Sequence, residues 1–432
     1  MKKGTNPSQR ARKTAPPSAT KPTGNLAPRD VERLAEELVA YHTEYADFYQ
    51  RREQREWAEF YLRGQLSELE RKTVEPMVLA DKGPDANAIR AVQQFLGEGS
   101  WCDEAILEHR ETLVAADLSA DEACLIFDGS GFPKQGEHSV GVARQYCGAV
   151  GKIANCQHGV FAVYANPRGY TFVDRRLYLP EHWFGADYAE KRRRCGVPAD
   201  LRFQTEPELA LEMLRGIVNR GVLSFNWVTA DEHYGMNPDF LDGVAALGKY
   251  YLAEVPVTTQ VWVGQVKILP PGQGKLGRPR SGARVAPGTP PPQAVRQIGA
   301  QLPAGAWQRS TIKEGSKGPI EADFAFIRAT SKRGLSPGHA VWVVFRRGLE
   351  AGAEIKVYLS NAPANCAHTQ LVRMSGMRWP VETAIEEAKS ELGMDHYETR
   401  TWRGWHHQMT LTFLAHHFLL RLRLKLKKSL RR

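Results

Sequence analysis

The spacing of apolar positions in the first quarter of the chain is helical. Four of these positions recur at intervals of three or four residues: Leu34, Leu38, Tyr41 and Tyr45. Similar spacing returns at residues 57–69 and 86–96. Such spacing places apolar side chains on one face of a helix. We therefore predict an N-terminal helical domain over residues 30–117, and we assign DNA-end recognition to it as a hypothesis.

The pattern then shortens to that of strands. Residues 123–127 are continuously apolar, and two further strand-like segments, 159–165 and 170–179, flank the turn signal Asn166-Pro167-Arg168-Gly169. The next expected elements are a helix, a buried strand, a helix and a strand, at residues 206–220, 225–230, 238–247 and 250–255. The order β-β-β-α-β-α-β predicts an α/β fold with an RNase H-like mixed sheet flanked by helices.

Regularity is lost after residue 257, where Pro and Gly crowd residues 270–292. Strand-like segments return at residues 322–329, 340–346 and 355–360, and helical ones at 381–392 and 409–428. The domains expected from this succession are a first part of the core, a β-rich insertion, and a second part of the core with a basic C-terminal helix, at residues 118–257, 258–360 and 361–432.

Composition narrows the class of protein. The chain has 432 residues, 42% of them hydrophobic and 25% charged, which is typical of a multi-domain globular protein. No run is apolar enough for a membrane helix, and no apolar segment follows the basic N-terminus as a signal peptide requires. Six cysteines without a CxxC pair argue against a disulfide framework and a zinc site. We therefore expect a cytoplasmic protein with reduced thiols.

Positive charge is concentrated at the two ends. Residues 1–29 contain seven Lys or Arg and residues 399–432 contain nine, with no acid in either segment. The two ends together therefore carry a charge of +16, and since the net charge of the chain is +10, the remaining residues carry −6. We predict a disordered basic arm over residues 1–29. Basic ends around a neutral-to-acidic body favour a polyanionic partner, although basic tails that only confer solubility are an alternative interpretation.

Three acids follow or begin predicted elements. Asp128 comes directly after the run 123–127, Asp231 follows the strand ending at residue 230, and Glu382 lies in the first turn of a helix after Pro380. Carboxylates gathered this way need cations, and oxygen ligands favour Mg²⁺ or Mn²⁺. Two ions roughly 4 Å apart would promote in-line phosphoryl transfer. Each acid alone is better explained as a turn or surface residue, so the hypothesis depends on their joint placement.

The neighbouring residues resemble the insertion-sequence transposases of the DDE superfamily, in the branch with a Tyr-Arg-Glu-Lys signature. Arg378, Glu382 and Lys389 keep that spacing, whereas Ser375 stands at the Tyr position. The resemblance runs from about residue 61 to about residue 415, and its most specific strings are Asp128-Gly-Ser-Gly-Phe-Pro-Lys134, His138-Ser-Val-Gly-Val-Ala-Arg-Gln-Tyr146, Asp174-Arg-Arg-Leu-Tyr-Leu-Pro180 and Gly393-Met-Asp-His-Tyr-Glu398. Members of that subgroup usually have a second acid where this chain has Gly129.

The resemblance implies cut-and-paste DNA transposition by an RNase H-like core that a β-rich insertion interrupts. It implies that Asp128, Asp231 and Glu382 bind two Mg²⁺ ions, with Mn²⁺ as a substitute, and that Arg378 and Lys389 contact DNA phosphates. The expected partner is double-stranded DNA, namely terminal inverted repeats and target DNA. The expected state on DNA is a homodimer or higher oligomer, at the bacterial nucleoid in the cytoplasm.

Other interpretations stay open at this point. Arg278 and Arg280 could enter a minor groove, or they could belong to a solvated loop. His233 is a weaker candidate for approaching the scissile DNA. The chain could instead be a domesticated transposase-derived DNA-binding or regulatory protein, or a nuclease that cuts without joining. Intact acids favour an active transposase over the domesticated protein, because a cluster of like charges is costly to keep.

Overall fold

A computed structural model describes residues 28–118, 120, 122–264, 266–270, 272, 282–315, 318–334, 336–350 and 352–429. By its internal contacts the chain divides into two units, residues 1–44 and 45–432. In the first unit the helix α1 (Pro28–Thr43) is described, and the expected basic arm lies outside the described residues up to residue 27. Arg278 and Arg280 also lie outside them. The domain boundaries expected above remain predictions.

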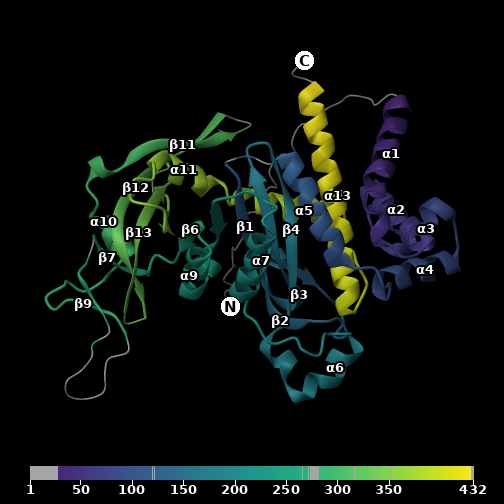
Figure 1. Cartoon of the computed structure of the whole chain (residues 1–432), viewed down its shortest axis with the longest axis horizontal. Coiled ribbons are helices and arrows are strands. Elements are labelled where there is room, and N and C mark those ends of the chain that lie inside the picture. Colours follow the sequence, from purple (N-terminus) through teal and green to yellow (C-terminus); the bar gives the residue numbers. More distant parts are fainter. Residues whose placement is uncertain are drawn as a thin grey trace, which may run out of the picture. The chain divides into compact units, whose positions relative to one another are not determined.

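Five strands of the second unit form the sheet that the sequence predicts. They are β1 (Cys124–Pro133), β3 (Lys152–Asn166), β4 (Gly169–Tyr178), β5 (Trp227–Ala230) and β6 (Tyr250–Val255). Their order is β4-β3-β1-β5-β6, with β3 antiparallel to β1 and β4, and with β5 parallel to β1 and β6 (Figure 1). This arrangement is RNase H-like and confirms the expected fold class.

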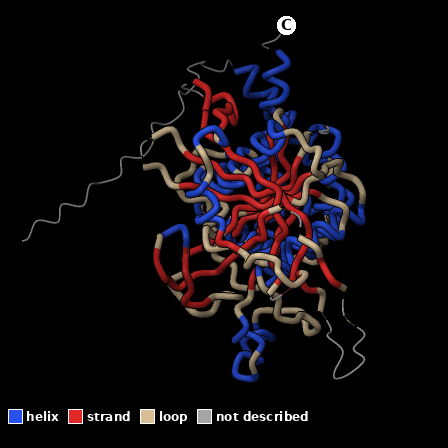
Figure 2. Tube along the Cα trace, turned by 90° about the vertical axis from the view of Figure 1, so that its left-hand side faces the viewer, coloured by secondary structure: helices blue, strands red, loops and turns tan. Residues whose placement is uncertain are grey.

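The alternation of side chains along β1 creates two cores, one on each face of the sheet. Leu125 and Phe127 belong to the core that includes residues of α7 (Glu206–Arg220) and α9 (Pro238–Ala246). Ile126 belongs to the opposite core, with residues of α12 (Trp379–Ser390) and α13 (Trp402–Ser429). Figure 2 shows the twisted strands with helices on both sides of them.

The β-rich insertion continues this sheet. β14 (Ile355–Ser360) pairs antiparallel with β6, and β13 (Ser336–Arg347), β12 (Gly318–Arg333) and β7 (Gln260–Val263) follow outward (Figure 1). The smaller elements of this region are β8 (Ile268–Leu269), β9 (Arg284–Val285), β10 (Gln293–Ala294), α10 (Val295–Gln301) and β11 (Gln308–Gly315). The inserted strands therefore extend the central sheet from its β6 edge.

Helices of the second unit that precede the sheet pack on the C-terminal helix: α2 (Arg52–Leu66), α4 (Ala86–Gly97) and α5 (Asp103–Leu118). The helix α3 (Val74–Lys82) packs on α2 and α4. Tyr61 donates a buried hydrogen bond of 2.6 Å to the Gln408 side chain of α13, and Gln65 donates one of 2.8 Å to Thr412. Contacts between segments far apart in the sequence therefore hold these helices against α13.

The remaining described elements are short. They are β2 (Ala143–Cys147), α6 (Ala189–Arg194), α8 (Glu232–Gly235), α11 (His368–Gly376) and the 3₁₀ turns Ala46–Phe48, Gly148–Val150, Glu181–Phe184, Ala186–Tyr188 and Ala304–Ala306. In the described part of the chain, none of the helices combines the length and the apolar character that crossing a membrane requires.

Candidate active site

The parallel pairing of β1 and β5 brings Asp128 and Asp231 next to each other, directly after the last residue pair of the two strands. β1 and β5 are parallel and in register as far as Phe127, which lies opposite Ala230. Each acid is the residue directly after this last pair. Because β5 ends at Ala230, β1 continues beyond it without that neighbour, and a cleft opens there.

Local hydrogen bonds orient the two aspartates. The Asp231 carboxylate caps α8, because its Oδ1 accepts bonds from the backbone N–H groups of His233 at 3.0 Å and Tyr234 at 3.4 Å. Asp128 Oδ1 accepts a bond of 2.8 Å from the Gly129 N–H. The second oxygen of Asp231 accepts no hydrogen bond from a described residue, whereas that of Asp128 faces the Arg378 guanidinium.

Glu382 approaches the same cleft from α12, in the first turn of that helix. The cleft has a volume of about 1090 Å³ and is lined by Asp128, Asp231, Glu382 and, two turns further along α12, Lys389. Arg378, which precedes α12, forms ion pairs with Glu382 and with Asp128 Oδ2, the latter at 3.9 Å. The structure thus brings together the three predicted acids and the two predicted cations near the cleft.

Burial disfavours the charged forms of Asp128 and Asp231. Burial, followed by the charge of Asp231, raises the pKa of Asp128 to about 7, although Arg378 acts in the opposite direction. Burial also raises the pKa of Asp231, against the bond from the Tyr234 N–H and the charge of Arg378. This electrostatic environment is that of carboxylates whose charge requires a cation for compensation.

The donor set suits a hard divalent cation, since all three groups are carboxylates. As the side chains stand, however, no three His, Cys, Asp or Glu residues in the described part of the chain are close enough to hold one metal ion. The Arg378 guanidinium supplies the positive charge at this point, through its pairs with Glu382 and Asp128. Metal binding would therefore require Glu382 to exchange Arg378 for the cation.

Sequence reasoning missed several residues that line the cleft, chiefly Glu206 and His158. Glu206 begins α7, and its Oε2 lies 3.2 Å from His158 Nε2 and 3.7 Å from His233 Nε2. A Cβ on Gly129 would lie 2.4 Å from His158 Nε2, so the absence of a side chain there makes room for this pair. In the sequence Glu206 is indistinguishable from an ordinary acid in a first helical turn, and only the packing of α7 against the sheet brings it to the cleft.

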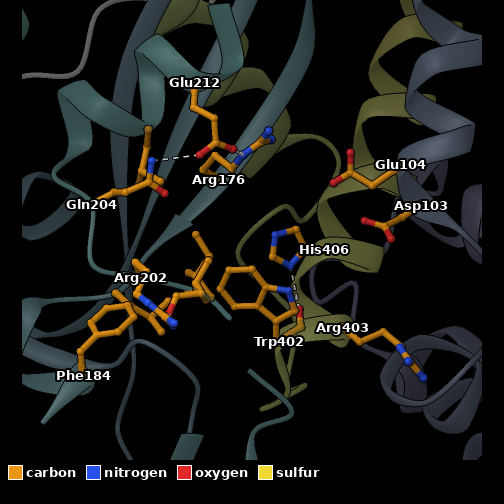
Figure 3. Close-up of a pocket in the computed structure, with 14 residues that line it drawn as sticks. Asp103, Glu104, Arg176, Phe184, Arg202, Gln204, Glu212, Trp402, Arg403 and His406 are labelled. Carbon is orange, nitrogen blue, oxygen red and sulfur yellow. Dashed lines mark hydrogen bonds and ion pairs between the residues drawn. The ribbon is translucent and has the colours of Figure 1, made fainter. Parts of the chain in front are cut away.

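A separate hollow of about 340 Å³, shown in Figure 3, is lined by an ion-pair network. Glu212 accepts a bond of 3.0 Å from Arg176 and one of 2.9 Å from Gln204, and Trp402 and His406 form the facing wall (Figure 3). The neighbouring Arg175 is fully buried and pairs with Asp103. The string that begins at Asp174 therefore has a structural role here. None of the three acids is part of this hollow's described lining.

Comparison with known proteins shows the family of the chain. Residues 44–319 match the family model of the DDE superfamily endonucleases, which is more than half of the chain. The chain belongs to this family. The match to the family of DDE endonucleases covers Asp128 and Asp231 and ends before Glu382.

Two individual proteins are also similar. The chain is 29% identical over 196 residues to a probable transposase for insertion sequence element IS701 from Microchaete diplosiphon. This alignment covers 44% of this chain and 46% of that protein. The match thus spans less than half of the relative's length. The NurA nuclease from Sulfolobus solfataricus aligns at 11% identity over 62% of this chain and 79% of its own, with a TM-score of 0.26, which is too low to support an argument about fold.

Proposed function

We propose that this DDE endonuclease is a transposase that cleaves DNA at the ends of an insertion sequence and joins them to target DNA by a cut-and-paste route. The observation that carries the proposal is the convergence of Asp128, Asp231 and Glu382 on one cleft from β1, β5 and α12. The family match and the name of the similar IS701 protein support it. The proposed substrate is double-stranded DNA with terminal inverted repeats, bound by a homodimer or higher oligomer at the nucleoid.

The proposed chemistry is two in-line phosphoryl transfers. Water attacks a phosphorus at the element end, and the P–O3′ bond breaks to leave a 3′-hydroxyl. That hydroxyl then attacks a target phosphodiester, forming one P–O bond and releasing one 3′-oxygen. Asp128, Asp231 and Glu382 would hold two Mg²⁺ ions, or Mn²⁺, which as Lewis acids stabilise the attacking and leaving oxygens. Arg378, once released from Glu382, and Lys389 would contact the DNA phosphates.

The test is an assay of Mg²⁺-dependent cleavage and joining on a duplex that carries the ends of the element flanking the gene. Asp231→Asn and Glu382→Gln are expected to reduce the rate roughly a thousandfold or more while DNA binding survives. Glu386→Gln is the matched control, because Glu386 lines the same cleft one turn further along α12. It is expected to keep activity within a few-fold of wild type.

Each alternative has its own outcome. Cleavage that is unchanged in Asp231→Asn and Glu382→Gln would overturn the assignment of the acids. Cleavage without joined product would identify a hydrolytic nuclease. DNA binding without cleavage by the wild-type protein would favour the domesticated DNA-binding protein.

A further inference from the structure

The cleft that holds the acids continues into a second hollow. This neighbour has a volume of about 490 Å³ and shares Pro133, Asp395 and His396 with the acidic cleft as common lining residues. Lys134 lines the neighbour, and Lys389 lines the acidic cleft. A strand of a substrate that passes from one hollow to the other would therefore meet both lysines.

Lys134 is held on an aromatic ring. Its ammonium lies 3.5 Å from the centre of the Tyr397 ring, and it donates a hydrogen bond of 3.2 Å to the Tyr397 carbonyl oxygen. Tyr397 is buried, and its hydroxyl donates a bond of 2.9 Å to Gln157. The ring therefore fixes the position of the cation before any ligand binds.

Lys389 is held in the same way on a neighbouring ring. Its ammonium lies 4.8 Å from the centre of the Phe132 ring and donates a hydrogen bond of 2.8 Å to the Gly131 carbonyl oxygen. Phe132 is fully buried, and its ring centre lies 5.9 Å from that of Tyr397. Two packed aromatic rings thus carry two lysines along the floor of the joined hollows.

These two cations are incompletely neutralised. Within the described residues neither ammonium is within 4.0 Å of a carboxylate, although each is half-buried. The negative charge of Asp395 raises the pKa of both lysines, and that of Glu398 raises the pKa of Lys134. The Glu398 carboxylate also forms an ion pair of 2.8 Å with Arg71. An ammonium has three donors, and each lysine uses one on a backbone carbonyl, so donors remain for an anion.

We propose that Lys134 and Lys389 form a preorganised two-cation floor that binds phosphates of one DNA strand as it leaves the three acids toward the second hollow. The inference rests on the proposed function, because it takes DNA as the substrate. It adds Lys134, which lies beyond the Arg-Glu-Lys positions, and it assigns a direction to the bound strand.

The experiment measures the affinity for a fluorescent 30-base-pair duplex of arbitrary sequence at several KCl concentrations, in EDTA and without divalent cations. Removal of one phosphate contact reduces the slope of log K against log salt by about 0.9 for duplex DNA and about 0.7 for a single strand. Lys134→Gln and Lys389→Gln are each expected to reduce the magnitude of this negative slope by that amount. The double variant should reduce the magnitude by about twice as much.

Lys249→Gln is the matched control. Lys249 also donates to a backbone carbonyl, that of Phe225 at 2.8 Å, and lies 4.4 Å from the centre of that residue's ring. Lys249 precedes the amino end of β6, whereas the acids lie toward the carboxyl ends of β1 and β5. The salt dependence of DNA binding by Lys249→Gln should therefore equal that of the wild-type protein. Lys134→Arg keeps the charge and should also keep the slope, which separates loss of charge from loss of folding.

A wild-type slope in Lys134→Gln, or an equal fall in Lys249→Gln, would overturn the two-cation floor while leaving the transposase proposal untouched. If the wild-type protein binds no DNA, the proposed function fails, and the inference fails with it. The slope requires no catalysis, so these two failures are distinguishable.

Discussion

The Asp128 carboxyl is the residue whose charge the fold disfavours most clearly in the cleft. Burial and the nearby charge of Asp231 raise its pKa to about 7 from an ordinary 3.8. A group whose pKa is raised by folding contributes stability that is fully present below its unfolded pKa and is lost as the pH rises through the folded value. For Asp128 this loss occurs between about pH 4 and pH 7, and we expect it to reverse when a divalent cation binds the ionised form.

Asp128→Asn should therefore stabilise the metal-free protein in a pH-dependent manner. A difference of about 3 pKa units corresponds to an upper bound of about 4 kcal/mol at pH 8, with less than half of that at pH 5. Thermal or urea unfolding in EDTA at both pH values measures it. Asp187→Asn is the control, because Asp187 is exposed and outside the cleft. A gain in stability that is the same at pH 5 and pH 8 would contradict the explanation.

Among the elements, the short helix α8 packs tightly against the sheet at Gly235. Asp231 caps its start, and Gly235 ends it directly against β6. A Cβ on Gly235 would lie 1.9 Å from the backbone carbonyl oxygen of Glu254. Because a backbone atom cannot move aside as the end of a flexible side chain can, Gly235 sets how closely α8, and with it Asp231, approaches the sheet.

Gly235→Ala should destabilise the protein by about 1–3 kcal/mol, since the added methyl group displaces α8 from β6. It should also lower DNA cleavage more than the loss of folded protein explains. Gly216→Ala is the control, and its expected effect on the free energy of unfolding has the opposite sign. That glycine lies inside α7, where a Cβ would meet only the Arg220 guanidinium at 3.3 Å, so alanine should stabilise by about 0.5–1 kcal/mol. Equal effects of the two substitutions on the unfolding midpoint would contradict this packing argument.

At the scale of the 45–432 unit, α13 connects the early helices to the sheet. Its face contains buried histidines, and burial lowers the pKa of His406 to about 3 and that of His407 and His417 to about 4. His407 lies 2.8 Å from the Leu96 carbonyl oxygen and stacks on Trp101 with ring centres 3.6 Å apart. Because burial disfavours the charged form of these rings, protonating them opposes the packing of α13.

The buried histidines of α13 should contribute less stability as the pH falls from 7 to 5, a direction opposite to that of Asp128. A lowered histidine pKa contributes stability that is present above the unfolded value of 6.5 and lost as the pH falls toward the folded value. His407→Gln, which cannot titrate, should lose about 2 kcal/mol less than wild type over this interval. Urea unfolding at pH 7 and pH 5 measures the difference. The exposed His339, replaced by Gln, is the control, and parallel pH profiles for wild type and His407→Gln would refute the role of that ring.

The elements that local pattern specifies were predictable from the sequence. The apolar run before Asp128, the turn at residues 166–169 and the helical spacing at residues 206–220 indicated β1, the β3–β4 hairpin and α7. The order of these elements led to the RNase H-like sheet, because few topologies suit that order. The approach of the three acids to one cleft was expected because each follows or begins a strongly patterned segment, although Asp128 lies inside β1, which continues to Pro133, and not at its end. The role of these acids as metal ligands stays a prediction.

Only the tertiary structure decided how distant segments meet. The pairing of β14 with β6 makes the insertion an extension of the central sheet, and no local pattern specifies which strand edge it joins. Packing of α7 brings Glu206 to the cleft, and the Phe132–Tyr397 contact joins the two rings on which Lys389 and Lys134 lie. Periodicity reports which face of an element is buried, whereas the partner of that face depends on contacts between residues far apart in the chain.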